Sequence, residues 1–147
     1  IELQLLYSDE NFSVPANVYI IGMMNTADRS LAMLDYALRR RFSFFTMKPG
    51  FNTPGFQAYQ DSLKNDAFNK LIACVKQLNS KIAEDISLGE GFCIGHSYFC
   101  GLTPETANTQ TLSSIVEYEL IPLLKEYWFD EPAKIVDWSD RLRSAVK

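Results

Sequence analysis

The sequence predicts a chain in two parts, an α/β part over residues 1–48 and an all-α part over residues 49–147. The first part contains two short apolar runs, Val18–Ile21 and Phe42–Phe45, whose β-branched and aromatic content is typical of buried strands. A polar tip and a helical pattern separate these runs, which is the order of elements in an open α/β sheet. In the second part, apolar residues recur at intervals of three and four, which indicates helices.

The composition limits the class of protein. With 47% hydrophobic and 22% charged residues, the 147-residue chain is able to bury a real core as one ordinary domain or two small ones. Its formal net charge of -4 gives no support for binding nucleic acid or an anionic membrane through the chain as a whole. A local basic cluster, Arg39–Arg41, is still suited to an anion.

Cysteine usage and hydropathy bear on the compartment. The three cysteines are odd in number and widely spread, which argues against a disulfide framework. No apolar run approaches the ~20 residues of a membrane span. We therefore expect a cytoplasmic protein that does not enter a membrane.

Within the α/β part, the elements follow one another closely. We expect Ile1–Leu6 to end a helix, and Tyr7–Asn17 to form a loop that leads into the first strand. The polar tip then runs from Asn25 to Ser30. The helix after it carries three leucines on one side and ends in the arginine cluster; these are Leu31, Leu34 and Leu38.

In the all-α part, most helices have a recognisable start. Thr53 supplies a capping hydroxyl immediately before Pro54, which suits the first helical position. Asn65 caps a longer helix. Its apolar stripe consists of Phe68, Leu71, Ile72, Val75, Leu78 and Ile82. Pro132 begins the last helix.

Three other features of this part are less regular. Ser87–Gly101 is rich in glycine and aromatic residues, which favours an ordered loop or a short hairpin. Leu112–Tyr127 is helical in pattern, and Pro122 should kink it because proline lacks a backbone donor. An aromatic group follows and is expected in the core, since its neighbours are acidic and a platform for stacking bases needs basic ones. The group is Trp128, Phe129 and Trp138.

Three motifs lie in order along the chain: MNTADRS over Met24–Ser30, DYALRRRF over Asp35–Phe42, and GHSYF over Gly95–Phe99. Together they resemble the McrB family of AAA+ GTPases, the motor subunits of modified-cytosine restriction systems. The second motif is shared more widely among AAA+ ATPases. The resemblance covers nearly the whole chain. It implies that residues 1–48 are the C-terminal end of an AAA+ P-loop NTPase core and that residues 49–147 are its α-helical lid domain.

Two motifs of such an enzyme are missing from the sequence. No G-x-x-x-x-G-K-[ST] loop is present to hold phosphates. The Asp-Glu pairs, Asp9-Glu10 and Asp130-Glu131, do not follow plausible strands, so no site for Mg²⁺ at a strand end is evident. We therefore expect the chain to be inactive alone and to belong to a larger nucleoside triphosphatase.

The polar tip supplies the first candidate site residues. From spacing alone, Asn25 is a residue that turns the chain or caps a helix. The resemblance implies that it is instead the sensor-1 residue, which positions the water that attacks the γ-phosphate. Thr26 shares this polar tip and is assigned to nucleotide binding.

The charged residues that follow have both a structural and a catalytic interpretation. Asp28, Arg29 and Asp35 suit helix caps and local ion pairs. The resemblance implies that Arg29 and Asp35 face the nucleotide of a neighbouring subunit, and Asp28 is counted with them among the catalytic residues. Three adjacent arginines cannot all pair locally, and Arg40 and Arg41 match the family's arginine fingers, which act in trans and are worth ~10³–10⁵ in rate.

The third motif contains the only histidine, His96. The spacing Cys93-x-x-His96-x-x-x-Cys100 is one that zinc sites use, but no fourth ligand is evident, so we expect no metal there. By resemblance, His96 and Ser97 lie near the nucleotide. The motif has no arginine nearby, which leaves a sensor-2 arginine in cis unassigned.

The resemblance implies hydrolysis of GTP (or ATP) with Mg²⁺ in the full-length protein, driving DNA translocation for restriction at 5-methylcytosine. It also implies a hexameric ring, an McrC-like nuclease partner, and contact with DNA through the full complex. Two alternatives stay open. One is an ATP-using remodelling enzyme of the MoxR type, and the other is a non-catalytic interaction module.

Overall fold

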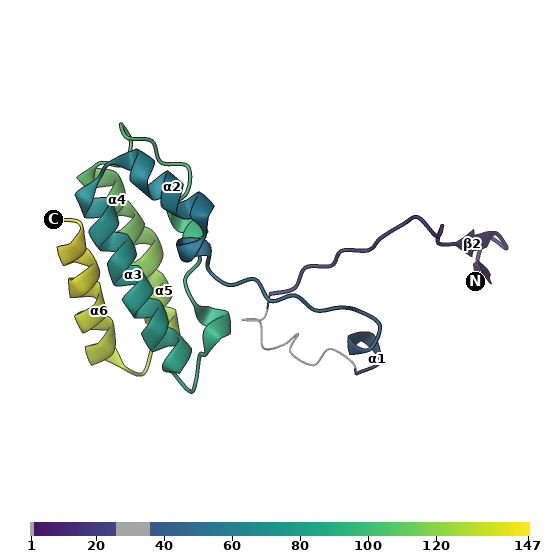
Figure 1. Ribbon diagram of the computed structural model, residues 1–147. Coiled ribbons are helices and arrows are strands. Elements are labelled where there is room, and N and C mark those ends of the chain that lie inside the picture. Colours follow the sequence, from purple (N-terminus) through teal and green to yellow (C-terminus); the bar gives the residue numbers. More distant parts are fainter. Residues whose placement is uncertain (1, 26–35) are drawn as a thin grey trace.

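The computed structural model describes residues 2–25 and 36–147 of the chain. Most of the described helix lies in a bundle over residues 50–147, while the preceding residues extend away from it (Figure 1). The bundle is built from α2 (Pro54–Leu63), α3 (Asp66–Glu84), α4 (Thr109–Ile115), α5 (Ile121–Tyr127) and α6 (Pro132–Ala145). In the described part of the chain, no helix is both long and apolar enough to cross a membrane.

The chain begins with a small hairpin rather than a helix. Strand β1 (Glu2–Gln4) pairs antiparallel with β2 (Asn11–Ser13), and Leu3 lies opposite Phe12. The prediction of a helix end at Ile1–Leu6 is therefore wrong, and the expected loop contains the partner strand. A turn closed by a hydrogen bond from the Leu5 N–H to the Glu10 carbonyl at 2.9 Å brings the two strands together. Residues 2–4 are therefore a strand because residues 11–13 supply hydrogen-bonding partners beside them.

The two predicted strands of the α/β part do not form. Val18–Ile21 has no strand assignment, and the exposed fraction of these four side chains runs from 50% to 91%. Phe42–Phe45 likewise lies outside any strand, with Phe45 87% exposed. A buried strand needs hydrogen-bonded neighbours, and among the described residues the only strand pairing is that of β1 with β2. Of the predicted helix, α1 (Tyr36–Arg39) is described, and the part before it lies outside the described residues.

The predicted helix starts of the bundle are confirmed. After a 3₁₀ turn, η2 (Gly50–Asn52), the Thr53 hydroxyl accepts a hydrogen bond from the Phe56 N–H at 3.3 Å and Pro54 takes the first helical position of α2. Asn65 caps α3 in the same way, accepting from the Phe68 N–H at 2.9 Å. Each cap satisfies an N–H that the helix itself leaves without a partner.

The core of the bundle is the apolar stripe of α3, which packs against α6 and the helical run from α4 to α5. Its predicted members are all buried. Full burial of an aliphatic or aromatic side chain contributes about 1.5–3 kcal/mol. Trp128 and Trp138 join this core as predicted, at 1% and 6% exposed. Phe129 does not: it is 80% exposed, because Trp128 occupies the inward position of the turn after α5.

The proline in the long helical segment is accommodated by a wider turn. Between α4 and α5 lies a π-helical turn, η5 (Val116–Leu120), and the Ile121 N–H bonds to the Val116 carbonyl five residues back. Pro122 has no N–H to donate, so the regular ladder is interrupted there. Where the sequence predicts a kink, the structure has a π turn within a helical run that extends from Thr109 to Tyr127.

The segment over Ser87–Gly101 is an ordered loop. It contains two 3₁₀ turns, η3 (Glu90–Phe92) and η4 (His96–Phe99), and has no strand assignment. Of the two predicted alternatives, the ordered loop is confirmed and the short hairpin is not formed. The GHSYF motif coincides with η4 and the residue before it.

Candidate functional site

The predicted catalytic residues that the structure describes lie in the N-terminal part. Asn25 is exposed, and Arg40 and Arg41 are exposed just after α1, which lies apart from the bundle in Figure 1. The neighbouring Arg39 guanidinium is 5.8 Å from the centre of the Phe44 ring. Four further candidates, namely Thr26, Asp28, Arg29 and Asp35, lie outside the described residues.

His96 joins the GHSYF loop to the first residue of the bundle. Its Nδ1 accepts a hydrogen bond from the Gly50 N–H at 3.0 Å. The imidazole also meets the rings of Phe51 and Phe56 edge-on, with centroids 6.2 and 5.8 Å away. Because Nδ1 is an acceptor here, the neutral ring carries its proton on Nε2. The contact is made by residues 46 positions apart in the sequence.

Asn79 holds the same loop from the middle of α3. Its Oδ1 accepts from the Ile94 N–H at 2.7 Å, and its Nδ2 donates to the Ile94 carbonyl at 2.9 Å. Asn79 and Ile94 are both buried, at 9% and 1% exposed. One side chain thus satisfies both backbone groups of a buried residue, as a neighbouring strand would. Sequence reasoning missed Asn79, although an asparagine next to Leu78 within an apolar stripe is a signal for such a bond.

Tyr59 of α2 fixes the other end of the loop and was also missed. Its hydroxyl lies 2.9 Å from the Phe99 carbonyl oxygen and 3.1 Å from that of Leu102, and it accepts the Leu102 N–H at 2.9 Å. Burial raises the pKa of the Tyr59 phenol, so this hydroxyl keeps its proton for donation. Together, His96, Asn79 and Tyr59 hold the motif at three points.

The two other polar residues of the motif, Ser97 and Tyr98, are exposed at the surface. Ser97 is exposed, and Tyr98 is 36% exposed, while Phe99 between them and the bundle is fully buried. The two cysteine thiols of the motif region bond to backbone carbonyls, Cys93 to that of Asn79 and Cys100 to that of His96. Over residues 2–25 and 36–147, no three His, Cys, Asp or Glu side chains gather as metal ligands would.

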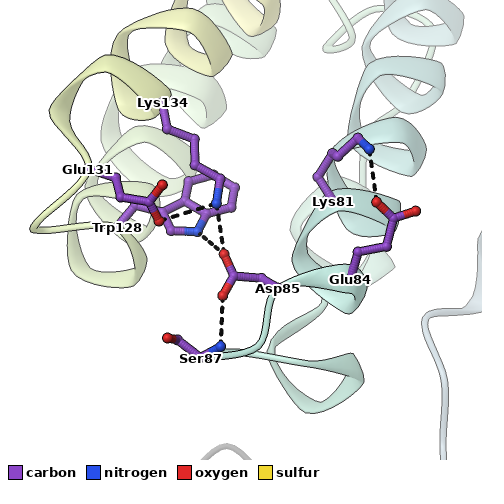
Figure 2. A network of polar contacts seen from close by, with 7 residues as sticks. All are labelled: Lys81, Glu84, Asp85, Ser87, Trp128, Glu131 and Lys134. Carbon is purple, nitrogen blue, oxygen red and sulfur yellow. Dashed lines mark hydrogen bonds and ion pairs between the residues drawn. The ribbon is translucent and has the colours of Figure 1, made fainter.

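A second polar cluster, centred on Asp85, ties together the ends of three helices (Figure 2). The Asp85 carboxylate follows α3 and accepts from Trp128 Nε1 at 2.8 Å, from Lys134 Nζ at 2.7 Å and from the Ser87 N–H at 2.9 Å. Lys134 Nζ also lies 4.3 Å from the centre of the Trp128 ring. The hydrogen bonds from Lys134 and Trp128 lower the pKa of Asp85 to about 2. Three donors converge on the Asp85 carboxylate, and Lys134 Nζ also donates to Glu131 Oε1 at 3.3 Å, so the cluster joins helix ends and has a structural role.

The helical part matches a known domain. Residues 70–136 match the family model described as "McrB, alpha-helical lid domain". The matched range runs from within α3 into α6, so it includes Asn79, the GHSYF loop and the Asp85 cluster.

Two relatives extend the comparison. Over 146 residues the chain is 51% identical to the type IV methyl-directed restriction enzyme EcoKMcrB subunit of Escherichia coli K12, covering 94% of this chain and 32% of that protein. Over 91 residues it is 32% identical to the type II restriction enzyme BsuMI component YdiS of Bacillus subtilis 168, covering 57% of this chain and 26% of that protein. The chain spans about a third or less of the length of these curated relatives.

Proposed function

Because the chain is of the McrB type and carries the helical lid of that family, we propose that it is the C-terminal part of an AAA+ nucleoside triphosphatase that drives DNA translocation in a restriction system. The observation that carries the proposal is the 51% identity over 94% of the chain, which must reach well beyond the lid match at residues 70–136. In this proposal, residues 1–48 complete the α/β core and residues 49–147 form the lid.

The exposure of the N-terminal part supports this division. Apolar side chains that the sequence predicts to be buried are exposed, with Tyr19 at 89%, Ile20 at 67% and Ile21 at 91%. A large apolar surface of this kind marks a surface that another part of a protein covers. The rest of an AAA+ sheet, supplied by a longer protein, would bury these residues.

The proposed chemistry divides between two subunits. Asn25 orients the attacking water as sensor 1, with Thr26 beside it, and GTP with Mg²⁺ (or ATP with Mg²⁺) is the substrate. Arg40 and Arg41 stabilise the charge that develops on the γ-phosphate of the neighbouring subunit. Their exposure just after α1 supports a role toward another subunit.

The remaining assignments follow the same proposal. Arg29 and Asp35 face the neighbour's nucleotide, Asp28 belongs to the same catalytic group, and Ser97 and His96 lie on the lid side of the site. The assembly is a cytoplasmic hexameric ring that works with an McrC-like nuclease and reaches DNA through the full complex. The exposed hydroxyl of Ser97 supports its place on the ligand side.

The proposal is tested by the hydrolysis of GTP and ATP by the full-length protein, with Asn25→Ala as the diagnostic variant. Loss of a group that acts mainly in the transition state should slow hydrolysis by about 10²-fold while nucleotide affinity stays nearly unchanged. Asn17→Ala, another exposed asparagine of the same segment, is the matched control. The isolated 147-residue chain should bind a non-hydrolysable GTP analogue weakly in calorimetry, because the phosphate loop is absent from it. A full-length protein without nucleotide hydrolysis, or micromolar binding by the isolated chain, would refute the proposal.

A further inference from the structure

Gly50 is the point where the chain joins the bundle. It is buried, it opens η2, and the residues immediately before it, 43–49, have no helix or strand assignment. Both of its backbone polar groups are bound: the N–H donates to His96 Nδ1, and the carbonyl accepts from the Thr53 hydroxyl at 2.8 Å and the Thr53 N–H at 3.0 Å. The first residue of the bundle is therefore fixed on both sides.

The imidazole lies so close to Gly50 that no side chain fits there. A Cβ at this position would come within 2.9 Å of His96 Cε1, 3.1 Å of Nε2 and 3.2 Å of Nδ1. The backbone at Gly50 is not left-handed, so the need for glycine is one of space rather than of conformation. Gly55, five residues later, has nothing within 4 Å of its own Cβ position.

The contact is surrounded by apolar rings. Phe51 is 4% exposed and packs edge-on against Phe56 at 5.2 Å and at a tilt against Phe99 at 5.9 Å. The exposed ion pair between Lys48 and Glu90, at 3.1 Å, spans the same two segments but contributes little in water. The hydrogen bond from Gly50 to His96 is the shielded polar contact between the joint and the motif loop.

We propose that His96 is a positioning residue that locks residues 50–53 to the GHSYF loop, so that the lid turns as one rigid body about the segment 43–49. The role of His96 in hydrolysis rests on the proposed function, whereas the contact between His96 and Gly50 does not. Without this hydrogen bond, the packing of Phe51 would hold the joint to the bundle but would leave the Gly50 backbone freer to move, so motion of the lid would be transmitted to the core less directly. A misplacement of ~1 Å at a catalytic site can cost ~10²-fold in rate.

The contact is tested directly by the nitrogen NMR signals of the imidazole in the 147-residue chain. Since the chain has a single histidine, the signals need no assignment by mutation. In the neutral ring we expect the proton on Nε2 and an unprotonated Nδ1 that accepts the Gly50 N–H. A proton on Nδ1 would overturn the proposal, because Nδ1 would then be a donor.

The packing is tested by thermal unfolding of paired variants of the same chain. Gly50→Ala should lower the Tm by several degrees, whereas Gly55→Ala should not lower it. In a His96→Ala background, which empties the space, Gly50→Ala should lower the Tm much less than it does in the wild type. Equal losses in both backgrounds would mean that the imidazole does not occupy the space above Gly50.

The role in hydrolysis is tested in the full-length protein with two polar replacements. His96→Asn places an acceptor close to the position of Nδ1 and should lower the rate of hydrolysis less than His96→Gln does. His96→Gln carries its acceptor one carbon further out and should lower kcat at least about tenfold, with nucleotide affinity and ring assembly unchanged. A wild-type protein without hydrolysis would refute the proposed function. An active wild type with an equally active His96→Gln would refute the positioning role alone.

Discussion

Single side chains that bond to backbone groups hold the motif loop in place. Asn79 shows the energetics most clearly, because both backbone groups of the buried Ile94 depend on it. Asn79→Ala should lower the free energy of unfolding by about 2–4 kcal/mol, since it leaves a buried donor and a buried acceptor without partners. Denaturant unfolding of the 147-residue chain measures this change. Asn69→Ala, an exposed asparagine of the same helix bonded to Gln60, should change the stability by less than about 0.5 kcal/mol. Equal effects of the two variants would contradict the role of Asn79.

Asp85 gives the bundle a pH-dependent contribution to stability. The pKa of its carboxyl is lowered from 3.8 to about 2 in the folded chain, chiefly by the hydrogen bond from Lys134. The unfolded chain therefore binds a proton before the folded one does, and this stability is complete above about pH 4 and is lost as the pH falls to about 2.

Allowing for solvent screening, Asp85→Asn should cost about 1–2 kcal/mol at neutral pH, and the difference from the wild type should shrink toward pH 2. Urea unfolding at several pH values measures this. Glu84→Gln, which removes the exposed pair with Lys81, is the control and should have little effect. A deficit for Asp85→Asn that stays constant down to about pH 2 would contradict the assigned pKa.

At the scale of elements, the sequence predicts the helices of the bundle correctly but not the strands. The caps at Thr53 and Asn65 and the apolar stripe of α3 are local patterns, and the structure has them where the sequence places them. A strand depends on a neighbour that may be far away in the sequence, so Val18–Ile21 has strand-like composition without a strand. The hairpin of β1 and β2 was missed because each strand has only three residues, too few to show an alternating pattern.

For the candidate site, the sequence predicts the motif residues but not which residues they contact. The GHSYF residues can be recognised from the motif itself, and His96 was found in this way. What His96 contacts was not predictable, since Gly50 lies 46 residues earlier and is brought to it only by the packing of Phe51 and Phe56. Tyr59 was missed because its partners are backbone groups, which leave no trace in the sequence of the loop.

The stripe of α3 is predicted to dominate the stability of the bundle. Leu78 is fully buried in it, so Leu78→Ala should lower the free energy of unfolding by about 2–5 kcal/mol through lost burial and the cavity that remains. Leu6 is 94% exposed in the N-terminal part, and Leu6→Ala should change it by less than about 0.5 kcal/mol. The midpoint of chemical denaturation distinguishes them, and a comparable loss in both variants would contradict the assignment of the core to the bundle.

At the scale of the whole molecule, the chain consists of a helical bundle with its own hydrophobic core and an N-terminal part in which most of the described apolar and basic side chains are exposed. Residues 70–136 of the bundle match the model of the McrB α-helical lid domain. In our proposal, the N-terminal part completes two sites at once: Asn25 serves the nucleotide of its own subunit, and Arg40 and Arg41 serve that of the neighbour.

The most direct test of the composite site is a mixing experiment with full-length protein. Arg40→Ala and Arg41→Ala should each lower hydrolysis by ~10³-fold or more, as should a separate variant disabled in the phosphate loop. Mixing an arginine variant with the phosphate-loop variant should restore part of the activity, because some interfaces then combine one intact nucleotide site with one intact arginine. Arg39→Ala, the adjacent exposed arginine over the Phe44 ring, should stay active alone. If the mixtures are folded and assembled but recover no hydrolysis, the site is not shared between two subunits.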